Sequence, residues 1–242
     1  MTGTTAPARH REVTYERGAN GVGYLVLRRP DKLNAVHRSM MGDLTEAFAA
    51  FHGDDAAAVA VLRGEGRAFC AGADVAARAA ADGPPAPGED LSRLPDLFLA
   101  RDAVKPIVAA AHGHVVGMGL RMVLLADLAL CTATTRFRAP EVGQGLDGGP
   151  YWWLLQARAG DAFATHAVAT GREWSGAEAE RRGLVTRCVA EDALTTEAEG
   201  LAAALAAQPR RALTALVDTR RQALRDVELT AWRARMRTGT TR

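Results

Sequence analysis

The sequence contains little lysine and little cysteine, and it has no long apolar run. Only two of its 30 basic residues are lysines, and its three cysteines are Cys70, Cys131 and Cys188. Because the cysteines are odd in number and form no Cys-x-x-Cys pair, a disulfide framework is not predicted, and a reduced, cytoplasmic setting fits best. No apolar run reaches the ~20 residues of a membrane-spanning helix. Residues 1–11 lack the apolar segment of a secretory signal, so neither membrane insertion nor export is expected.

The sequence also lacks a strong charge of either sign. The 30 basic residues are balanced by 28 acidic ones, which leaves a net charge of +2. So small a surplus does not predict nucleic-acid binding. Hydrophobic residues make up 48% of the chain and charged residues 24%, which excludes a disordered or fibrous protein. A chain of 242 residues buries roughly 70–75% of its unfolded surface, so it can fold without disulfides or metals.

Apolar periodicity predicts strands that alternate with helices. The clearest strand signals are a hairpin over residues 13–28, around an Asn-Gly turn, and a buried strand over Ile107–Ala111. Helices are predicted over Ser39–Phe51, with Ser39 as N-cap, over Glu89–Arg101 and over Asp161–Thr170. This alternation indicates an α/β protein.

The chain divides into two regions of different pattern. Residues 1–192 carry the alternating strands and helices, and we expect them to form the core. Residues 193–242 are Arg-rich and helical throughout, so they are expected to form a separate helical region. The Pro- and Gly-rich stretch at residues 82–88 predicts a loop within the first region.

Three glycine-punctuated segments are candidate ligand-binding loops. They are Gly64–Asp74 (GEGRAFCAGAD), Ala111–Gly119 (AHGHVVGMG) and Phe137–Gly145 (FRAPEVGQG). Glycine lets backbone N–H groups approach a ligand closely, and the start of a helix adds a positive dipole. Two such donors aimed at one oxygen would stabilise an enolate, and a nearby carboxylate would move protons.

These segments, in this order, resemble the enoyl-CoA hydratase/isomerase (crotonase) superfamily. The matching blocks cover about residues 22 to 190 and are Arg29-Pro30, Leu33-Asn34-Ala35, Gly66–Asp74, Lys105–Gly119, Ala126-Asp127, Phe137–Gly145 and Thr170–Val185. The resemblance implies an α/β fold, a crotonase-like spiral of ββα units in two stacked sheets, with a C-terminal helical region for trimerisation. It also implies an acyl thioester of CoA or of an acyl-carrier protein as substrate, a homotrimer or hexamer, and no cofactor beyond the CoA of the substrate.

The resemblance also assigns roles to single positions. The two N–H groups of the oxyanion hole fall on Ala73 and Met118, and the catalytic acid/base falls on Glu141. Ala71 and its neighbours would line the CoA cleft.

We place three further residues at the substrate, namely Ala35, Asp74 and Trp153. Trp152 and Trp153 are expected to pack in the core, with one of them as a wall of the acyl pocket. His112 and His114 form a His-x-His pair, but no third ligand has a suitable spacing. No metal site is therefore predicted.

Three positions depart from the family pattern. Hydratases of the family hold a water between two glutamates, and the first of those positions is Arg121 here. An arginine stays protonated and cannot act as a general base. Arg121 is either a lost catalytic position, a partner that lowers the pKa of Glu141, or a ligand for a substrate carboxylate. Met118 replaces a glycine and reshapes the pocket, and Asp147 is either a turn residue or a second catalytic acid.

The favoured hypothesis is isomerisation of a 3-enoyl thioester, with Glu141, assisted by Asp147, as the acid/base. Three alternatives remain open. Hydration survives if Asp147 replaces the lost glutamate. Decarboxylation or carbon–carbon cleavage follows if Arg121 binds a substrate carboxylate. A protein that binds acyl-CoA without catalysis is the third.

Overall fold

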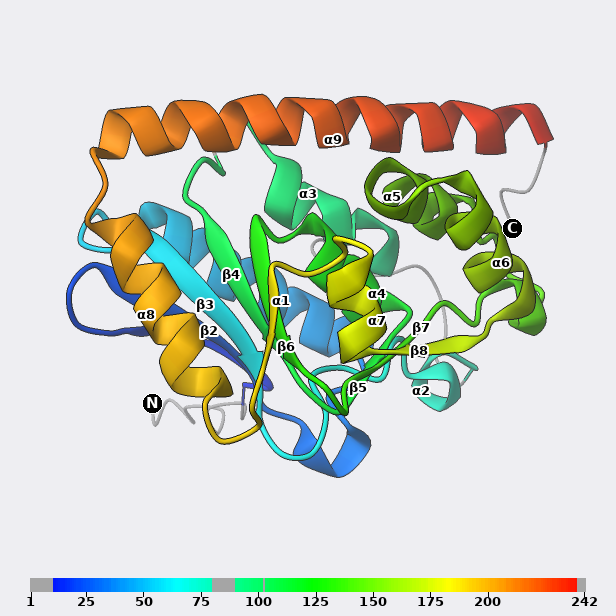
Figure 1. The fold of residues 1–242 in the computed structure, drawn as a ribbon, viewed down its shortest axis with the longest axis horizontal. Coiled ribbons are helices and arrows are strands. Elements are labelled where there is room, and N and C mark those ends of the chain that lie inside the picture. The colour runs from blue at the N-terminus through cyan, green and yellow to red at the C-terminus, as the bar shows by residue number, and fades with distance from the viewer. Residues whose placement is uncertain (1–10, 80–89, 102, 239–242) are drawn as a thin grey trace, which may run out of the picture.

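The fold is built on two β-sheets that helices cover on several sides (Figure 1). The computed structural model describes residues 11–79, 90–101 and 103–238. The larger sheet has the order β1-β2-β3-β4-β6-β9. Its strands are β1 (Val13–Arg17), β2 (Val22–Leu27), β3 (Val59–Gly64), β4 (Ile107–Ala111), β6 (Leu128–Thr132) and β9 (Arg187–Val189). All neighbours are parallel except β1 and β2, as expected for strands that are separated by helical crossovers.

The predicted hairpin and the predicted buried strand are both confirmed. β1 and β2 pair antiparallel from Val13 opposite Leu27, and Asn20 and Gly21 of the turn both have positive φ. Primed hairpin turns require positive φ, which is why Asn-Gly is so strong a signal. β4 has the predicted bounds, and all five of its residues are buried.

The smaller sheet consists of three short strands that the sequence did not reveal. β5 (His114–Val116), β7 (Arg136–Arg138) and β8 (Glu173–Ser175) pair in that order. Each has three residues, too few to show an alternating pattern. A single bridge between Cys70 and Val115 joins this sheet to the first glycine loop.

Helices occur where the apolar periodicity predicts them, but several begin or end at other residues than predicted. They are α1 (Arg38–Gly53), α2 (Val75–Ala79), α3 (Leu94–Leu99), α4 (Met118–Leu125), α5 (Gly149–Ala159), α6 (Asp161–Thr170), α7 (Gly176–Arg181), α8 (Leu194–Ala206) and α9 (Arg210–Thr238). α6 has both predicted bounds. The prediction of Ser39 as N-cap is wrong, because His37 has the extended conformation of the cap and accepts a hydrogen bond from the Met41 N–H (3.0 Å).

The helix predicted over residues 89–101 is also shorter than expected. A 3₁₀ turn occupies Leu91–Arg93, and α3 starts with Pro95 in its first turn, where a missing N–H does no harm. Glu89 and the loop predicted at residues 82–88 lie outside the described residues.

Two helices cover opposite faces of the larger sheet. α1 buries its apolar face, which includes Leu44, Phe48 and Phe51, in the main core. α8 places Leu194, Ala198 and Ala202, spaced four residues apart, on the other face against β3, β4 and β6. The first helix of the region 193–242 therefore packs on the sheet of its own chain.

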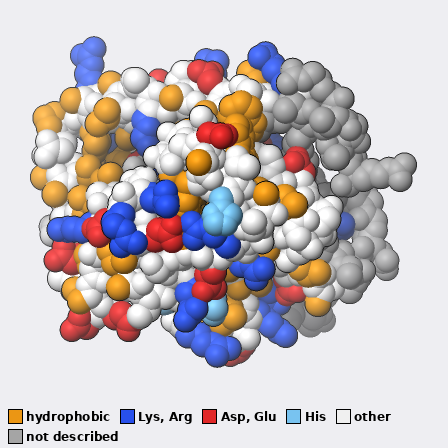
Figure 2. Space-filling view, turned by 45° about the vertical axis from the view of Figure 1, so that its right-hand side comes forward, with side chains coloured by type: hydrophobic (Ala, Val, Ile, Leu, Met, Phe, Trp, Pro, Cys, Tyr) orange, Lys and Arg blue, Asp and Glu red, His pale blue; other side chains and the backbone are white. Residues whose placement is uncertain are grey.

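α9 runs along one edge of the molecule, across α3 and α5 (Figure 1). It is rich in arginine, and no helix in the described ranges is both long and apolar enough to cross a membrane. The face in Figure 2 carries basic and acidic side chains intermixed, as the balanced charge predicts. A role of α9 in assembly stays a prediction.

Candidate active site

The first two glycine loops lie against each other, backbone to backbone. The Val116 N–H donates to the Cys70 oxygen (3.0 Å), and the Cys70 N–H donates to the His114 oxygen (3.1 Å). A Cβ on Gly119 would lie only 2.3 Å from the Cys70 oxygen. The contact therefore requires glycine at position 119, and it fixes the start of α4 beside the loop that ends in Asp74.

The N–H groups of Ala73 and Met118, predicted to form an oxyanion hole, lie in this contact. Neither donates a backbone hydrogen bond within the described chain. Each follows a glycine with positive φ, +103° at Gly72 and +50° at Gly117. A Cβ on Gly117 would lie 3.8 Å from the Gly72 Cα, so the two glycines are neighbours. Both donors are thus available at the amino end of α4, where the helix dipole favours negative charge.

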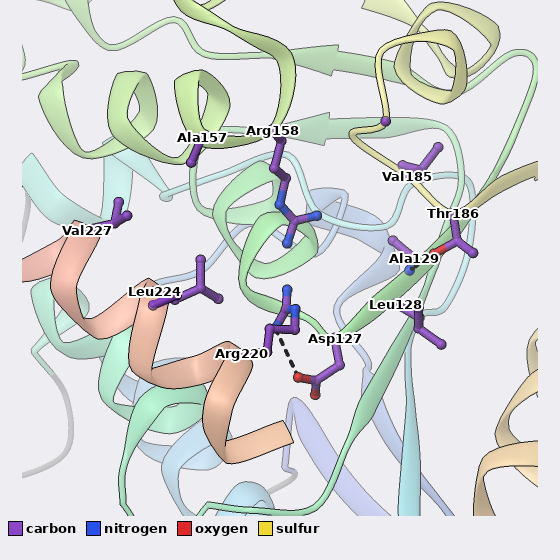
Figure 3. Close-up of a pocket in the computed structure, with 12 residues that line it drawn as sticks. Asp127, Leu128, Ala129, Ala157, Arg158, Val185, Thr186, Arg220, Leu224 and Val227 are labelled. Atoms are coloured by element: carbon purple, nitrogen blue, oxygen red, sulfur yellow. Dashed lines mark hydrogen bonds and ion pairs between the residues drawn. The ribbon is translucent and has the colours of Figure 1, made fainter. Parts of the chain in front are cut away.

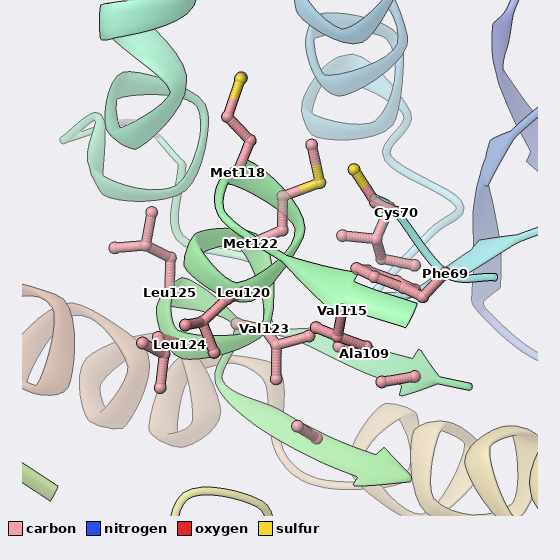
Figure 4. Close-up of a cluster of buried hydrophobic side chains, with 14 of the residues drawn as sticks. Phe69, Cys70, Ala109, Val115, Met118, Leu120, Met122, Val123, Leu124 and Leu125 are labelled. Carbon is pink, nitrogen blue, oxygen red and sulfur yellow. The ribbon is translucent and has the colours of Figure 1, made fainter. Parts of the chain in front are cut away.

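The side chain of Met118 is buried, with 7% exposed. Figure 4 shows it extending from the first turn of α4 away from Val115 and Ala109. The buried side chain of Met118, where the family has glycine, therefore fills part of the space beside the predicted oxyanion hole. Cys70 is fully buried, and burial raises the pKa of its thiol to about 12, so it stays an inert core residue.

Glu141 follows β7 and reaches back to the start of α4. Its Oε1 would be 2.8 Å from a Cβ on Gly117, and its Oε2 is buried without a hydrogen-bond partner among the described residues. Burial raises the pKa of Glu141 above its usual value, and this outweighs the lowering by the Tyr151 hydroxyl and by the charge of Arg121. A buried carboxylate with one free oxygen and a raised pKa is suited to accept and return a proton.

Tyr151 is a residue of this site that the sequence did not reveal. It lies in the first turn of α5, only 7% exposed, and its phenol interacts with the Glu141 carboxyl group. Burial and the neighbouring carboxylate raise its pKa well above 10, so the phenol stays neutral and donates. In the sequence it is only a tyrosine after Gly-Gly-Pro, a pattern that predicts the start of a helix but no role for the tyrosine.

Arg121 has a partner that no sequence pattern indicated. Its Nη2 lies 2.5 Å from Oε2 of Glu228, which is on α9, 107 residues away. Both side chains are largely buried, 12% and 17% exposed. The charge of Arg121 lowers the pKa of Glu141, which is one of the three roles left open for it, but burial outweighs this effect and the pKa is raised. Arg121 and Glu228 line a pocket of about 560 Å³ between α3, α4, α5 and α9.

Asp147 has the role of a turn residue. Its Oδ1 accepts a hydrogen bond from the Gly149 N–H (2.8 Å), which satisfies one of the free donors at the start of α5. A catalytic role for Asp147 stays a prediction.

The remaining predicted substrate-binding residues have structural contacts of their own. The Ala71 N–H bonds the Leu33 oxygen (2.9 Å), and the Ala35 oxygen accepts from Arg29 (2.7 Å). Asp74 accepts from the Ala77 N–H at the start of α2 and pairs with Arg29 at 2.8 Å, and these two contacts lower its pKa. Trp153 lies on α5 with its ring edge-on to Trp152 at 4.9 Å, and it is not among the described residues that line the pocket beside Arg121. Substrate contact by these four residues stays a prediction.

The His-x-His pair has no metal-site geometry. His112 Nε2 lies 2.9 Å from the Gly66 oxygen, which ties the two glycine loops together, and His114 is exposed. No group of three or more His, Cys, Asp or Glu side chains in the described ranges is arranged to hold a metal ion.

Replacing Gly117 by alanine is expected to damage both the fold and the site. Its φ of +50° and ψ of −116° are strained for any residue with a Cβ, and that Cβ would press on Glu141. We expect a loss of about 1–3 kcal/mol in the free energy of unfolding, measured by urea denaturation, and a displaced carboxylate. Gly143→Ala is the matched control, because a Cβ there meets open space. If the two variants were equally stable, the predicted backbone strain at position 117 would be wrong.

Comparisons with known proteins identify the family. The sequence profile described as enoyl-CoA hydratase/isomerase matches residues 17–240. A protein of Mycobacterium tuberculosis named "Probable enoyl-CoA hydratase EchA14" is 37% identical over 202 residues, 83% of this chain and 78% of its own. A protein of Rhizobium meliloti named "Probable enoyl-CoA hydratase" is 35% identical over 195 residues, 76% of this chain and 72% of its own.

Solved structures with a similar fold are also enoyl-CoA hydratases. The crystal structure of an enoyl-CoA hydratase from Mycobacterium smegmatis superposes with a TM-score of 0.79 at 29% identity, covering 94% of this chain and 91% of that one. The structure of enoyl-CoA hydratase EchA8_6 from Mycobacterium marinum gives 0.78 at 29% identity, covering 87% and 99%. The predicted crotonase-like α/β fold is therefore confirmed. With its sequence matched over residues 17–240 and its fold shared, the chain belongs to the enoyl-CoA hydratase/isomerase family of enzymes that act on acyl-CoA thioesters.

Proposed function

We propose that this protein moves the double bond of an enoyl-CoA thioester from the 3- to the 2-position, with Glu141 as its single acid/base. The observation that carries the proposal is the pairing of one buried, partly unsatisfied carboxylate with two free N–H donors. Glu141 Oε2 has no partner in the described chain, and the N–H groups of Ala73 and Met118 donate to no backbone oxygen. A site with one base and an oxyanion hole fits proton transfer better than capture of water between two carboxylates.

The reaction needs two proton transfers by one group. The Glu141 carboxylate takes a proton from C2 of a 3-enoyl thioester, and the electron pair moves onto the thioester oxygen. The N–H groups of Ala73 and Met118 hold the resulting dienolate oxygen. Glu141, now protonated, returns the proton to C4, which forms the 2-enoyl thioester and restores the carboxylate. The neutral phenol of Tyr151 neighbours the carboxyl group throughout.

The ion pair of Arg121 supports this reaction over the cleavage of a carboxylated substrate. The charge of Arg121 is already balanced by Glu228 at 2.5 Å, so a substrate carboxylate would have to share the guanidinium with Glu228 or displace it. Hydration is the second candidate, because the relatives that match this chain are named enoyl-CoA hydratases. It would require Asp147, whose Oδ1 accepts from Gly149, to serve as the second acid, or one carboxylate to activate the water alone.

One incubation distinguishes these reactions. The purified protein is mixed with 3-hexenoyl-CoA, and separately with 2-hexenoyl-CoA, in heavy water, and mass spectrometry follows product and deuterium. Isomerisation gives the conjugated 2-enoyl thioester with deuterium at C2 or C4. A 3-hydroxyacyl product would show that hydration is the reaction instead. Binding of the thioester without any product or exchange would leave an acyl-CoA-binding protein and refute the proposal.

A further inference from the structure

A second pocket, remote in sequence from the glycine loops, lies between α5, α9 and β6. Its volume is about 410 Å³. Figure 3 shows Arg158 of α5 and Arg220 of α9 pointing into it from opposite sides, with Asp127 of the segment before β6 beside Arg220. Two guanidinium groups thus face each other across a space that is large enough for a small molecule.

Basic charge exceeds acidic charge in this pocket. Asp127 is the acidic side chain that the described residues contribute to its lining, and it already pairs with Arg220 (2.9 Å) and with the buried Arg221 (2.6 Å). Arg158 has no carboxylate partner within the described chain. Burial, together with the charge of Arg220, lowers the pKa of Arg158 to about 10. Arg158 still carries its charge at neutral pH, next to a group of the same sign.

The structural contacts of the two arginines leave donors free. Arg158 donates to the main-chain oxygens of Leu124 and Leu184, and Arg220 donates to those of Leu125 (3.4 Å) and Ala126 (2.6 Å). Leu124 and Ala126 are at the carboxyl end of α4, where a cation is favourable. Each guanidinium has five N–H groups, and these contacts together with Asp127 do not use them all. An anion between the arginines would fill the remaining donors and relieve their repulsion.

We propose that this pocket binds the carboxylate of a small aliphatic acid between Arg158 and Arg220. The rest of the lining determines the class of anion. Ala157 of α5, Val185, and Ala223, Leu224 and Val227 of α9 present hydrocarbon to the pocket. An inorganic oxyanion would pair with the two arginines but leave these apolar side chains in contact with water. The alkyl chain of a short aliphatic acid would bury them as well. The site is independent of the reaction at Glu141.

Binding of such an acid would join α9 to α5 and β6, so it should stabilise the folded protein. Thermal unfolding of the full chain is measured with increasing hexanoate, and with acetate, phosphate and chloride at the same ionic strength. Hexanoate at about 100 times its Kd is expected to raise Tm by about 5–10 °C, with saturation. Titration calorimetry checks that hexanoate binds with a one-to-one ratio. Absence of saturation, or an equal rise with phosphate, would overturn the proposal.

Three variants separate the pocket from the rest of the surface. Arg220→Gln removes one of the facing charges. Ala223→Phe keeps both arginines and fills the apolar part, so it remains informative if Arg220→Gln does not fold. Both are expected to lose the response to hexanoate. Arg211→Gln, at an exposed position of the same helix outside the pocket, is expected to keep it. An unchanged response in Ala223→Phe would show that hexanoate binds elsewhere.

Discussion

Replacing Glu141 by glutamine is expected to lower the rate of double-bond isomerisation by about 10²–10⁴-fold, the range that a positioned acid/base contributes. Glutamine has nearly the same shape but cannot accept a proton, so substrate binding should change little while kcat falls. The measurement is the conversion of 3-hexenoyl-CoA under saturating conditions. Glu173→Gln is the matched control, because Glu173 is exposed and pairs with Arg136 on the surface. A Glu141→Gln variant with nearly full activity would remove Glu141 from the mechanism.

The pH dependence of the wild-type enzyme gives an independent check on the same carboxylate. Only ionised Glu141 can take the C2 proton, so kcat/KM should fall as pH drops through its pKa. Because burial raises that pKa, the acidic limb is expected above the usual glutamate value of 4.5. A limb at or below 4.5 would mean that another group controls the rate.

The raised pKa of Glu141 also predicts the effect of the substitution on stability. A carboxyl group with a higher pKa in the folded state binds its proton more tightly there than in the unfolded chain. The folded state therefore loses stability relative to the unfolded state as pH rises from the unfolded-state pKa through the folded-state pKa. Glutamine does not ionise, so Glu141→Gln is expected to be at least as stable as the wild type at neutral pH. Urea denaturation measures this, and a clear loss of stability would attribute the lost activity to misfolding.

Replacing Asp127 by alanine is expected to cost about 3–5 kcal/mol in the free energy of unfolding, the range for removal of one partner of a buried ion pair. Asp127 accepts hydrogen bonds from Arg220, from Arg221 and from the Ile107 N–H (2.9 Å). Arg221 is only 1% exposed, and its Nη1 has no partner in the described part of the chain. Without Asp127 neither arginine would have a carboxylate partner, and Arg221 would be left as a buried charge.

Chemical denaturation at one fixed protein concentration measures this loss. Asp127→Asn keeps the shape and removes only the charge, so it should fall between wild type and alanine. Asp218→Ala is the matched control, because Asp218 pairs with Arg225 of the same helix while 55% exposed. That pair is expected to contribute less than about 1 kcal/mol. An Asp127→Ala variant as stable as Asp218→Ala would show that the network does not hold α9 to the core.

The sequence determined the family, the fold class and those elements whose signal is local. The Asn-Gly hairpin, the apolar run of β4 and α6 were predicted correctly, because turn chemistry and side-chain period act over a few neighbouring residues. The glycine loops were identified for the same reason, since positive φ and close backbone contact demand glycine at Gly72, Gly117 and Gly119. The start of α1 was misplaced because serine is a favoured cap residue, whereas the helix begins one residue before Ser39, with His37 as a cap that makes no side-chain hydrogen bond.

Only the tertiary structure decided how the chemical groups meet. The strands β5, β7 and β8 exist because distant segments pair, which no run of three residues reveals. Glu228 reaches Arg121 from 107 residues away, and Tyr151 interacts with Glu141 from ten positions further along the chain. The pKa of Glu141 depends on burial, which is a property of the packed molecule. Local sequence sets which conformations a segment prefers, whereas the partners, burial and charge of a side chain come from residues that the fold brings beside it.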